Sequence, residues 1–278
     1  MKELGLVYLA RAANGIAPVR RFVEAYRRNR GGIEHELIVV FKGFRDETAA
    51  RQERECLGDF AHQALFIPDA GFDLDGYSAA AAKFDCRCFC FVNSFSEPLD
   101  TDWLAKLHRQ LVQPGVGLVG GTGSFESLLN NIQLEASSPM GVPLHKKLMR
   151  PLRLAWARRW FEPFPNPHIR TNAFMLAAEV WRKVKPGPLR WKLDALRYES
   201  GKDSLTNRVA RLGLATLIVG KDGQAFAPAD WPRSRTLRLG DQSNLLVMDN
   251  RTRQFAEASA QLKQHLARLA WGERALSR

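Results

Sequence analysis

The sequence lacks the features of several common protein classes. Only four of its 278 residues are cysteine, and no two of them form a Cys-x-x-Cys pair, so neither a disulfide framework nor a zinc site is expected. No run approaches the roughly 20 apolar residues that a membrane span requires. The first apolar segment, Leu4–Ala10, stops at Arg11 without a cleavage pattern. We therefore expect a cytoplasmic protein with buried, reduced thiols.

The signature motifs of three large enzyme classes are also missing. The absence of Gly-x-x-x-x-Gly-Lys-Ser/Thr disfavours a P-loop phosphotransferase. The absence of Gly-x-Gly-x-x-Gly after the first apolar strand disfavours a dinucleotide dehydrogenase, and the absence of Gly-x-Ser-x-Gly disfavours an α/β-hydrolase. The glycine-rich stretch at 120–123 follows a late strand and has none of these spacings.

Positive charge dominates the composition. Lys and Arg total 41 against 29 Asp and Glu, a formal charge of +12, while hydrophobic residues make up 45%, enough for a large core. Such a balance favours anionic partners: nucleotides, nucleic acid, acidic glycans or an anionic membrane face. The alternative is a basic surface that serves solubility alone.

Strand-like and helix-like patterns alternate along the first half of the chain. This alternation predicts an α/β fold with a mostly parallel sheet flanked by helices. A longer apolar stretch, 168–176, predicts one strand that returns to the sheet, and Phe255–Trp271 predicts a C-terminal amphipathic helix. The expected strands are 4–9, 36–41, 64–67, 86–92, 116–120 and 216–219.

Residues 146–160 carry six positive and no negative charges. Within this segment the residues Leu148, Leu152, Trp156 and Trp160 recur every four positions, which predicts a basic helix with an apolar face. Such a helix suits an anionic membrane surface, which makes the protein peripheral at the inner face of the membrane. The alternative is an ordinary helix that packs its tryptophans into the core.

Polar and glycine residues follow four successive predicted strands. Because ligands of open parallel sheets bind beyond the carboxyl ends of the strands, these residues are candidates for a nucleotide site. Basic groups there suit phosphates, and glycines allow close approach of the backbone. The set comprises Arg11, Asn14, Lys42, Gly43, Asp69, Asp73, Asn93, Ser94 and Ser96.

The order of these segments resembles the GT-A fold glycosyltransferases, particularly the large inverting family that uses nucleotide-sugar donors. The match consists of Asp69–Asp73 before the alanines at 79–82, and of Phe91–Pro98 before Trp103-Leu104. The resemblance implies a GT-A-like domain over 1–235 and a C-terminal extension over 236–278 that packs on it. The donor-binding residues that it implies are Ala10, Arg11, Asn14, Lys42, Gly43, Gly71, Asp73, Tyr77, Asn93, Ser94 and Ser96.

By the same resemblance, the reaction moves a sugar from a nucleotide-sugar to a glycan or lipid-linked acceptor, with bacterial surface-polysaccharide assembly as its setting. Glu199 or Asp203, which precede an Arg-x-x-x-Gly-like helix end, is then the general base that deprotonates the acceptor hydroxyl. Alternatively, both are solvated carboxylates near a helix start. Residues assigned to the acceptor or the diphosphate are His168, Arg170, Asn172 and Arg253, with Lys83 and Arg235 as further basic candidates.

The sequence departs from the family at the Asp-x-Asp motif that holds Mg²⁺ or Mn²⁺. Asn93-Ser94-Phe95-Ser96 stands there, with Ser96 and Glu97 at the metal position. Amides and hydroxyls are poor sole ligands for a hard dication. Three interpretations stay open: weak metal binding helped by Glu97 or Asp100, a metal-independent enzyme that uses basic residues, or a lost activity.

Two other functions are weighed against the transferase. A sugar nucleotidyltransferase shares the general sheet, but its Gly-x-Gly-Thr-Arg loop does not match 10–15. A non-catalytic protein that binds polyanions would explain the charge alone. No nucleic-acid-binding module is visible, so no nucleic-acid partner is expected.

Overall fold

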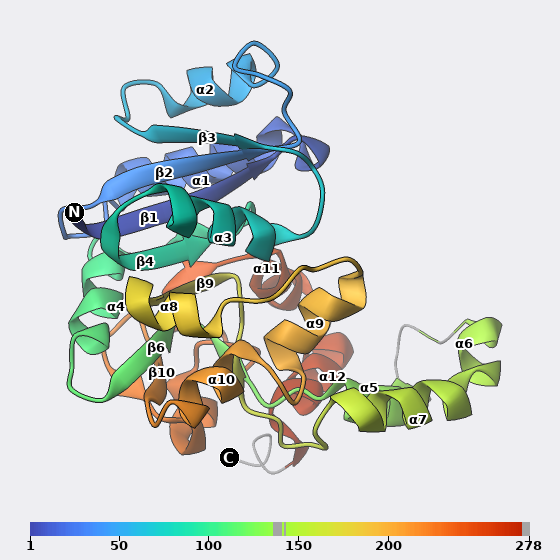
Figure 1. Cartoon of the computed structure of the whole chain (residues 1–278). Helices are drawn as coiled ribbons and strands as arrows, with labels where there is room; N and C mark the ends of the chain where they lie inside the picture. Colours follow the sequence, from blue (N-terminus) through green and yellow to red (C-terminus); the bar gives the residue numbers. More distant parts are fainter. Residues whose placement is uncertain (136–140, 142, 274–278) are drawn as a thin grey trace.

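The computed structural model describes residues 1–135, 141 and 143–273. Its centre is an eight-stranded sheet in the order β11-β10-β6-β9-β4-β1-β2-β3 (Figure 1). The strands are β1 (Lys2–Arg11), β2 (Glu36–Lys42), β3 (Gln63–Ile67), β4 (Cys86–Val92), β6 (Val116–Gly120), β9 (Ala173–Ala177), β10 (Ala215–Val219) and β11 (Ala225–Phe226).

The sheet is mostly parallel, as predicted. Strand β1 pairs in parallel with both β2 and β4, β2 with β3, and β10 with β6. Strand β9 lies antiparallel between β4 and β6, and β11 is antiparallel at one end. Because Val92 at the end of β4 is paired with Ala173 at the start of β9, the segment that precedes β9 lies at the carboxyl edge of the parallel strands.

Helices cover both faces of the sheet, which explains why its central strands are apolar throughout. On one face α1 (Ile16–Arg28) and α4 (Trp103–Leu111) pack on the core. On the other lie α3 (Asp73–Lys83), α8 (Ala178–Val184) and α10 (Leu205–Arg211). The four cysteines are free, and Cys86, Cys88 and Cys90 are buried in β4.

Three helices extend to one side of this body: α5 (Leu128–Leu134), α6 (Leu144–Leu148) and α7 (Arg150–Trp160) (Figure 1). The predicted basic helix over 146–160 is divided between α6 and α7, with Met149 between them. Trp156 and Trp160 are partly buried in a small core between α5 and α7, whereas Leu148 and Leu152 are 73% and 64% exposed. A spacing of four advances about 40° around a helix at each step, so these side chains turn away from one common face.

Between Asn166 and Ala177 the predicted single strand is wrong. The chain forms β8 (His168–Ile169), which pairs with β7 (Gly123–Ser124) in a separate ribbon, and then β9. The polar residues 170–172 interrupt the apolar run and lie between the two strands at the sheet edge. The short helix η1 (Ala12–Asn14) follows β1 at this same edge. Along the chain, α2 (Arg51–Leu57) comes after β2 and before β3.

The C-terminal segment returns to the sheet. After η3 (Pro228–Ser234), strand β12 (Val247–Met248) pairs with β5 (Glu97–Pro98), just beyond β4. The predicted single C-terminal helix is two helices, α11 (Asn250–Glu257) and α12 (Ala260–Trp271), because the Ser259 side chain caps a new helix start by accepting from the Leu262 N–H. Leu246, Val247 and Trp271 join the main core clusters.

Candidate functional site

Basic and acidic side chains meet where β1, β2 and β3 end. The Arg11 guanidinium donates two hydrogen bonds, of 2.7 and 3.1 Å, to the Asp69 carboxylate. Lys42, whose side chain is fully buried, donates to the Ala70 carbonyl and lies 3.8 Å from Asp69. Burial lowers the pKa of Lys42 against the pull of Asp69, while the hydrogen bond from Arg11 lowers the pKa of Asp69. The fold thus brings these predicted residues together.

The backbone beside this group has little free space. Gly43 has a positive φ of 80°, and a Cβ there would lie 2.9 Å from the Cβ of Asp69, so only glycine fits this turn. Gly71 also has a positive φ, and Asn14 is half-buried in η1. The side chain of Ala10 is fully buried in the core, so this predicted residue can offer a ligand only its backbone.

Helix α3 begins at the same edge and carries Asp73 and Tyr77. Asp73 is half-buried, and burial raises its pKa; Glu199 and Asp69 raise it further by repulsion, while Arg11 and Lys42 oppose the rise. Tyr77 is fully buried and stacks on Phe91 with ring centroids 4.8 Å apart. Tyr77 is therefore mainly a core residue beneath the edge.

The residues at the expected metal motif bind one another. The Asn93 Oδ1 accepts hydrogen bonds from the Phe95 N–H and the Ser96 hydroxyl, both at 3.0 Å. The Ser96 hydroxyl also lies 2.8 Å from the Asn172 carbonyl. These contacts hold residues 93–96 in a tight turn after β4, against the segment that precedes β9. The oxygen atoms of Asn93 and Ser96 are therefore engaged within the protein.

Glu97 is also occupied. Its carboxylate lies 3.1 Å from the Arg21 guanidinium and accepts a hydrogen bond from Arg253 of α11. A carboxylate shared by two guanidinium groups does not fit a dication, which needs free anionic oxygens. Among the described residues, the one group with metal-ligand atoms within 4.8 Å of one another is Glu3, Cys88 and His108. Glu3 lies near the amino end of β1, at the opposite edge of the sheet.

Among the residues that the structure describes, one buried side-chain atom of the turn after β4 and one of the segment before β9 lack a hydrogen-bond partner. They are the Ser94 hydroxyl and the Asn172 Nδ2. The other side-chain atom of Asn172, its Oδ1, accepts a hydrogen bond from the Thr122 hydroxyl at 3.0 Å. An unpaired buried polar group is costly, so such atoms commonly mark a position that a ligand or water completes.

Glu199 lies near the end of α9 (Lys192–Ser200), half-buried. Thr171, between β8 and β9, donates to its Oε1 from the backbone N–H at 3.3 Å and from the hydroxyl at 3.1 Å. The charge of Glu199 reaches Asp73 on one side and His168 and Arg170 on the other, since it contributes to the pKa of all three. Glu199 thus lies between the strand-end residues and a pocket.

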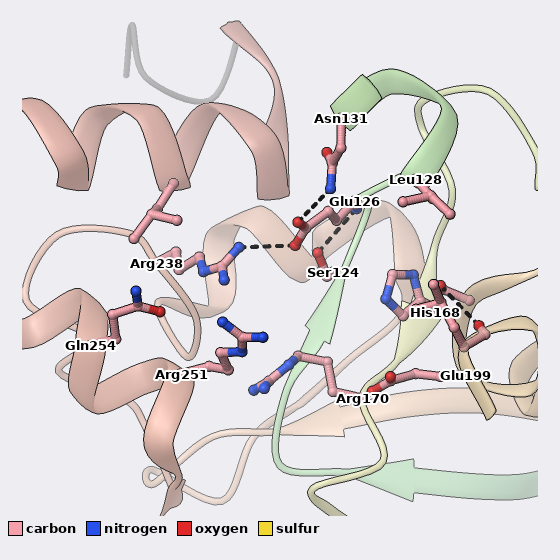
Figure 2. A pocket seen from close by; sticks show the side chains of 13 residues that line it. Ser124, Glu126, Leu128, Asn131, His168, Arg170, Glu199, Arg238, Arg251 and Gln254 are labelled. Carbon is pink, nitrogen blue, oxygen red and sulfur yellow. Dashed lines mark hydrogen bonds and ion pairs between the residues drawn. The ribbon is translucent and has the colours of Figure 1, made fainter. Parts of the chain in front are cut away.

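This pocket has a volume of about 320 Å³ and lies beside β8, α9 and α11 (Figure 2). Arg170 pairs with buried Asp249 at 2.6 Å, and Arg238 pairs with Glu126 at 2.9 Å. His168 is buried, with its Nδ1 2.9 Å from the Asn166 carbonyl, and burial lowers its pKa. The lining residues are Ser124, Glu126, Leu128, Asn131, His168, Arg170, Leu196, Glu199, Ser200, Arg238, Arg251, Gln254 and Leu266.

The structure separates Asp203 from Glu199. Asp203 pairs with Arg208 at 2.5 Å and with Arg211, and it lines a different pocket of about 300 Å³. Among the further basic candidates, Lys83 lies at the far end of α3 and contacts the Phe84 ring, and Arg235 pairs with Asp241 on the surface. Neither of these two residues lines the pocket beside Glu199.

Comparisons with known proteins bear on the fold. No protein-family model matches the sequence, and no curated protein matches it. Among solved structures, a mannosyltransferase from Pyrobaculum calidifontis in complex with GDP-Man and Mn²⁺ superimposes over 85% of this chain with a TM-score of 0.50 and 14% identity. The chain has a GT-A fold. It spans 61% of the length of that mannosyltransferase.

Weaker similarities are to glucosyl-3-phosphoglycerate synthase from Mycobacterium tuberculosis (TM-score 0.41, 13% identity, 76% of this chain and 63% of that one) and to CMP:2-keto-3-deoxy-manno-octonic acid synthetase in complex with CTP (TM-score 0.44, 12% identity, 78% and 90%). Within the GT-A fold, the carboxyl edge described above is the edge at which open sheets of this kind bind ligands. Both the Arg11–Asp69 group and Glu199 lie there.

Several residues near this edge and in the pocket had no signal in the sequence. Thr171 lies inside an apolar run, and Arg251 lies in a polar tail. Glu126 follows the glycine-rich stretch, which the sequence analysis set aside because it matched no fingerprint. Arg238 lies in irregular chain and reaches Glu126 across 112 positions, a distance at which no local pattern predicts contact.

Proposed function

We propose that this protein is a glycosyltransferase that moves a sugar from a nucleotide-sugar to an acceptor hydroxyl. The observation that carries the proposal is the position of Glu199, a carboxylate held by Thr171 between the strand-end group and the pocket. A base at that junction can reach an acceptor in the pocket while the donor lies along the strand ends. The GT-A fold supports this arrangement.

In the proposed step, Glu199 accepts the proton of the acceptor hydroxyl. The acceptor oxygen forms a bond to the anomeric carbon of the donor, and the bond from that carbon to the diphosphate oxygen breaks. The nucleoside diphosphate leaves with the electron pair. Direct displacement of this kind inverts the anomeric centre, which is the outcome we propose.

The leaving diphosphate needs positive charge where its own charge develops. The residues Asn93, Ser96 and Glu97 do not fit a metal ion, so we assign this role to cations of the chain. Arg11 and Lys42 lie at the strand ends, and Arg253 lies beside Glu97. Each is fixed by a carboxylate or carbonyl, which positions it before the donor arrives.

We further propose that α6 and α7, which carry the basic residues of 146–160, hold the enzyme at an anionic membrane surface. We also propose that the acceptor is a glycan or a lipid-linked sugar of a surface polysaccharide. The exposed leucines Leu148 and Leu152 support the membrane contact, together with the six positive charges of the segment. None of the described helices is long and apolar enough to cross a membrane.

Thermal unfolding in the presence of UDP-, GDP-, dTDP- and CMP-sugars, each with Mn²⁺ and with EDTA, tests the proposal. A donor at about 100 times its Kd adds about 2.7 kcal/mol of stability, which shifts the melting temperature by several degrees. We expect a shift with one nucleotide class that persists in EDTA. A shift with a nucleoside triphosphate and none with any nucleotide-sugar would instead indicate a nucleotidyltransferase, and no shift at all would contradict both enzymes.

A further inference from the structure

The pocket beside Glu199 has a basic wall. Arg170, Arg238 and Arg251 come from three separate segments, and their side chains extend toward the same region (Figure 2). They are close enough that the charges of Arg170 and Arg251, after burial itself, lower the pKa of Arg238. Like charges this close repel one another, so the cluster is more favourable when anions lie beside it.

Carboxylates of the protein satisfy only part of this wall. The Asp249 carboxylate accepts a hydrogen bond from one terminal nitrogen of Arg170, and the Glu126 carboxylate accepts one from a terminal nitrogen of Arg238. The Arg238 side chain is only 9% exposed, and its buried Nε has no hydrogen-bond partner among the described residues. Its backbone also has a positive φ of 47°, a conformation uncommon outside glycine. A guanidinium held in this way with a free donor suits a phosphate oxygen.

Arg251 supplies the remaining charge. It follows the Asp249 cap of α11, is exposed at the pocket, and has no ion pair with any residue that the structure describes. Gln254, one turn further along α11, adds an amide to the same wall. An anion in the pocket would therefore meet a free guanidinium, a partly free buried one, and neutral donors.

An apolar groove adjoins this pocket. It has a volume of about 460 Å³ and is lined by Leu128, Ile132, Leu152, Arg153, Trp156, Leu193 and Leu196. Leu128 and Leu196 line both the groove and the pocket, so the two cavities share a wall. The groove continues into exposed apolar side chains, among which Leu152 is 64% and Leu193 is 45% exposed.

Helix α9 connects the two regions. Of its residues, Leu193 lines the groove, Glu199 lines the pocket, and Leu196 lines both. At 1.5 Å per residue, Leu193 lies about 9 Å along the axis from Glu199. A ligand near Glu199 can therefore extend into the groove over a distance that a short hydrocarbon chain covers.

From these features we infer that the acceptor is an anionic amphiphile: a molecule with a hydroxyl for Glu199, a phosphate or diphosphate for Arg238 and Arg251, and an apolar chain for the groove. This inference rests on the proposed transferase function and narrows its acceptor class. A soluble sugar would leave the groove unused. A neutral lipid would leave Arg251 without an ionic partner and the Arg238 Nε without an acceptor among the described residues. The amphiphile is the one class that satisfies both cavities.

Binding of simple probes to the full chain, without donor, tests the inference. The probes are inorganic phosphate, hexyl phosphate, decyl phosphate and uncharged decyl glucoside, all below their micelle concentrations, with Kd measured by calorimetry. Each fully buried methylene contributes about 0.8 kcal/mol, which lowers Kd about fourfold. In a half-open groove, we expect each methylene to lower Kd about twofold. We therefore expect decyl phosphate to bind at least tenfold more tightly than hexyl phosphate, and far more tightly than decyl glucoside.

Two exposed positions separate the contributions. Arg251→Ala should weaken both alkyl phosphates about tenfold, and Leu193→Ser should weaken decyl phosphate but leave inorganic phosphate unchanged. Matched controls are Arg109→Ala and Leu212→Ser, since Arg109 is exposed on α4 and Leu212 is 43% exposed beyond α10. Neither control residue lines the pocket or the groove.

Equal affinity for inorganic and decyl phosphate would overturn the apolar half of the inference, and equal affinity for decyl phosphate and decyl glucoside would overturn the anionic half. The same protein is tested for binding of nucleotide-sugars. If a nucleotide-sugar binds and no alkyl phosphate does, the acceptor class is wrong and the transferase proposal stands. If no nucleotide-sugar binds, the transferase proposal itself fails.

Discussion

Thr171 donates two hydrogen bonds, from its backbone N–H and from its hydroxyl, to the same carboxylate oxygen of Glu199. The other oxygen of Glu199 is not used in this contact. Because Glu199 is half-buried, this arrangement fixes the carboxylate and leaves one oxygen to receive a proton. This geometry supports our proposal that Glu199 acts as a positioned base.

Replacing Glu199 by Gln should lower transfer at least 100-fold, because general-base catalysis contributes 10²–10⁴-fold. Donor binding should stay unchanged, since the amide keeps the shape of the side chain. The measurement is nucleoside diphosphate release in the presence of acceptor, alongside donor Kd. Asp203→Asn is the matched control and should retain activity, because Asp203 pairs with Arg208 and Arg211 elsewhere. Loss of activity in the control alone would move the base to Asp203.

If Glu199 is the base, Thr171 should position it, and this role can be tested separately from folding. Thr171→Val removes the hydroxyl hydrogen bond to Glu199 and keeps the backbone one. We expect kcat to fall about tenfold with little change in KM, since a misplaced base affects the chemical step more than binding. Thr171→Ser restores the hydroxyl and should recover most of kcat. A fall in KM and kcat together in both variants would indicate a purely structural role.

Arg253 should contribute to binding of the donor diphosphate. Arg253→Ala removes one of the two guanidinium groups on Glu97 and leaves Arg21 in place. We expect the Kd for the nucleotide-sugar to rise about tenfold, the size of one charge-assisted hydrogen bond. The measurement is calorimetry in EDTA, with Arg109→Ala as the control. A strict requirement for Mn²⁺ in the unmodified protein would contradict the assignment of this role to arginine.

Asp249 makes stability depend on acid pH. Burial alone would raise the pKa of Asp249, but the Arg170 charge and the Thr252 N–H outweigh it and hold the pKa below its ordinary value. The folded state therefore binds fewer protons than the unfolded state. This contribution is present above the unfolded pKa of 3.8 and is lost as the pH falls through the folded pKa.

In urea unfolding at several pH values, Asp249→Asn should be less stable than the unmodified protein at pH 7, because Arg170 loses its partner. The difference between the two should narrow as the pH falls below about 4. Asp59→Asn, at an exposed position, should follow the unmodified protein throughout. A constant difference between Asp249→Asn and the unmodified protein at every pH would refute the role of this carboxylate.

The exposed leucines of α6 should mediate contact with anionic lipid. Leu144 and Leu148 are 71% and 73% exposed beside Lys146 and Lys147. The double replacement by Glu should reduce cosedimentation with phosphatidylserine-containing vesicles about tenfold at low salt, because it removes apolar contact and adds negative charge. Leu212→Glu is the control. Equal binding of both variants would contradict the membrane proposal.

The sequence predicted the parallel part of the sheet because those strands are short apolar runs followed by polar loops, a local pattern. Its failures involve contacts between distant residues. The insertion of β9 between β4 and β6 depends on pairings such as Cys90 with Met175, which no local pattern encodes. The break at 170–172 was visible as three polar residues, but the apolar residues on both sides outweighed it.

The site divides in the same way. The strand-end residues Arg11, Lys42 and Asp69 were predictable because parallel strands place their ends at one edge. Arg238 was not, since its contact with Glu126 joins two irregular segments. The metal motif was an intermediate case. The altered residues of this motif were visible in the sequence. The hydrogen bonds of Ser96 to Asn93 and of Arg253 to Glu97 were not predictable from it.

The position of β9 also fixes the order in which the sheet can be completed. The block β3-β2-β1-β4 contains all its residues once Val92 has been synthesised. Strand β6, by contrast, has neither neighbour until Ala173–Ala177 and Ala215–Val219 have followed. On the ribosome, the apolar edge of β4 therefore remains open while about 80 further residues are made, at 5–20 residues per second for roughly 4–16 seconds. During that interval β4, one of the two central strands of the finished sheet, is available for pairing with another chain.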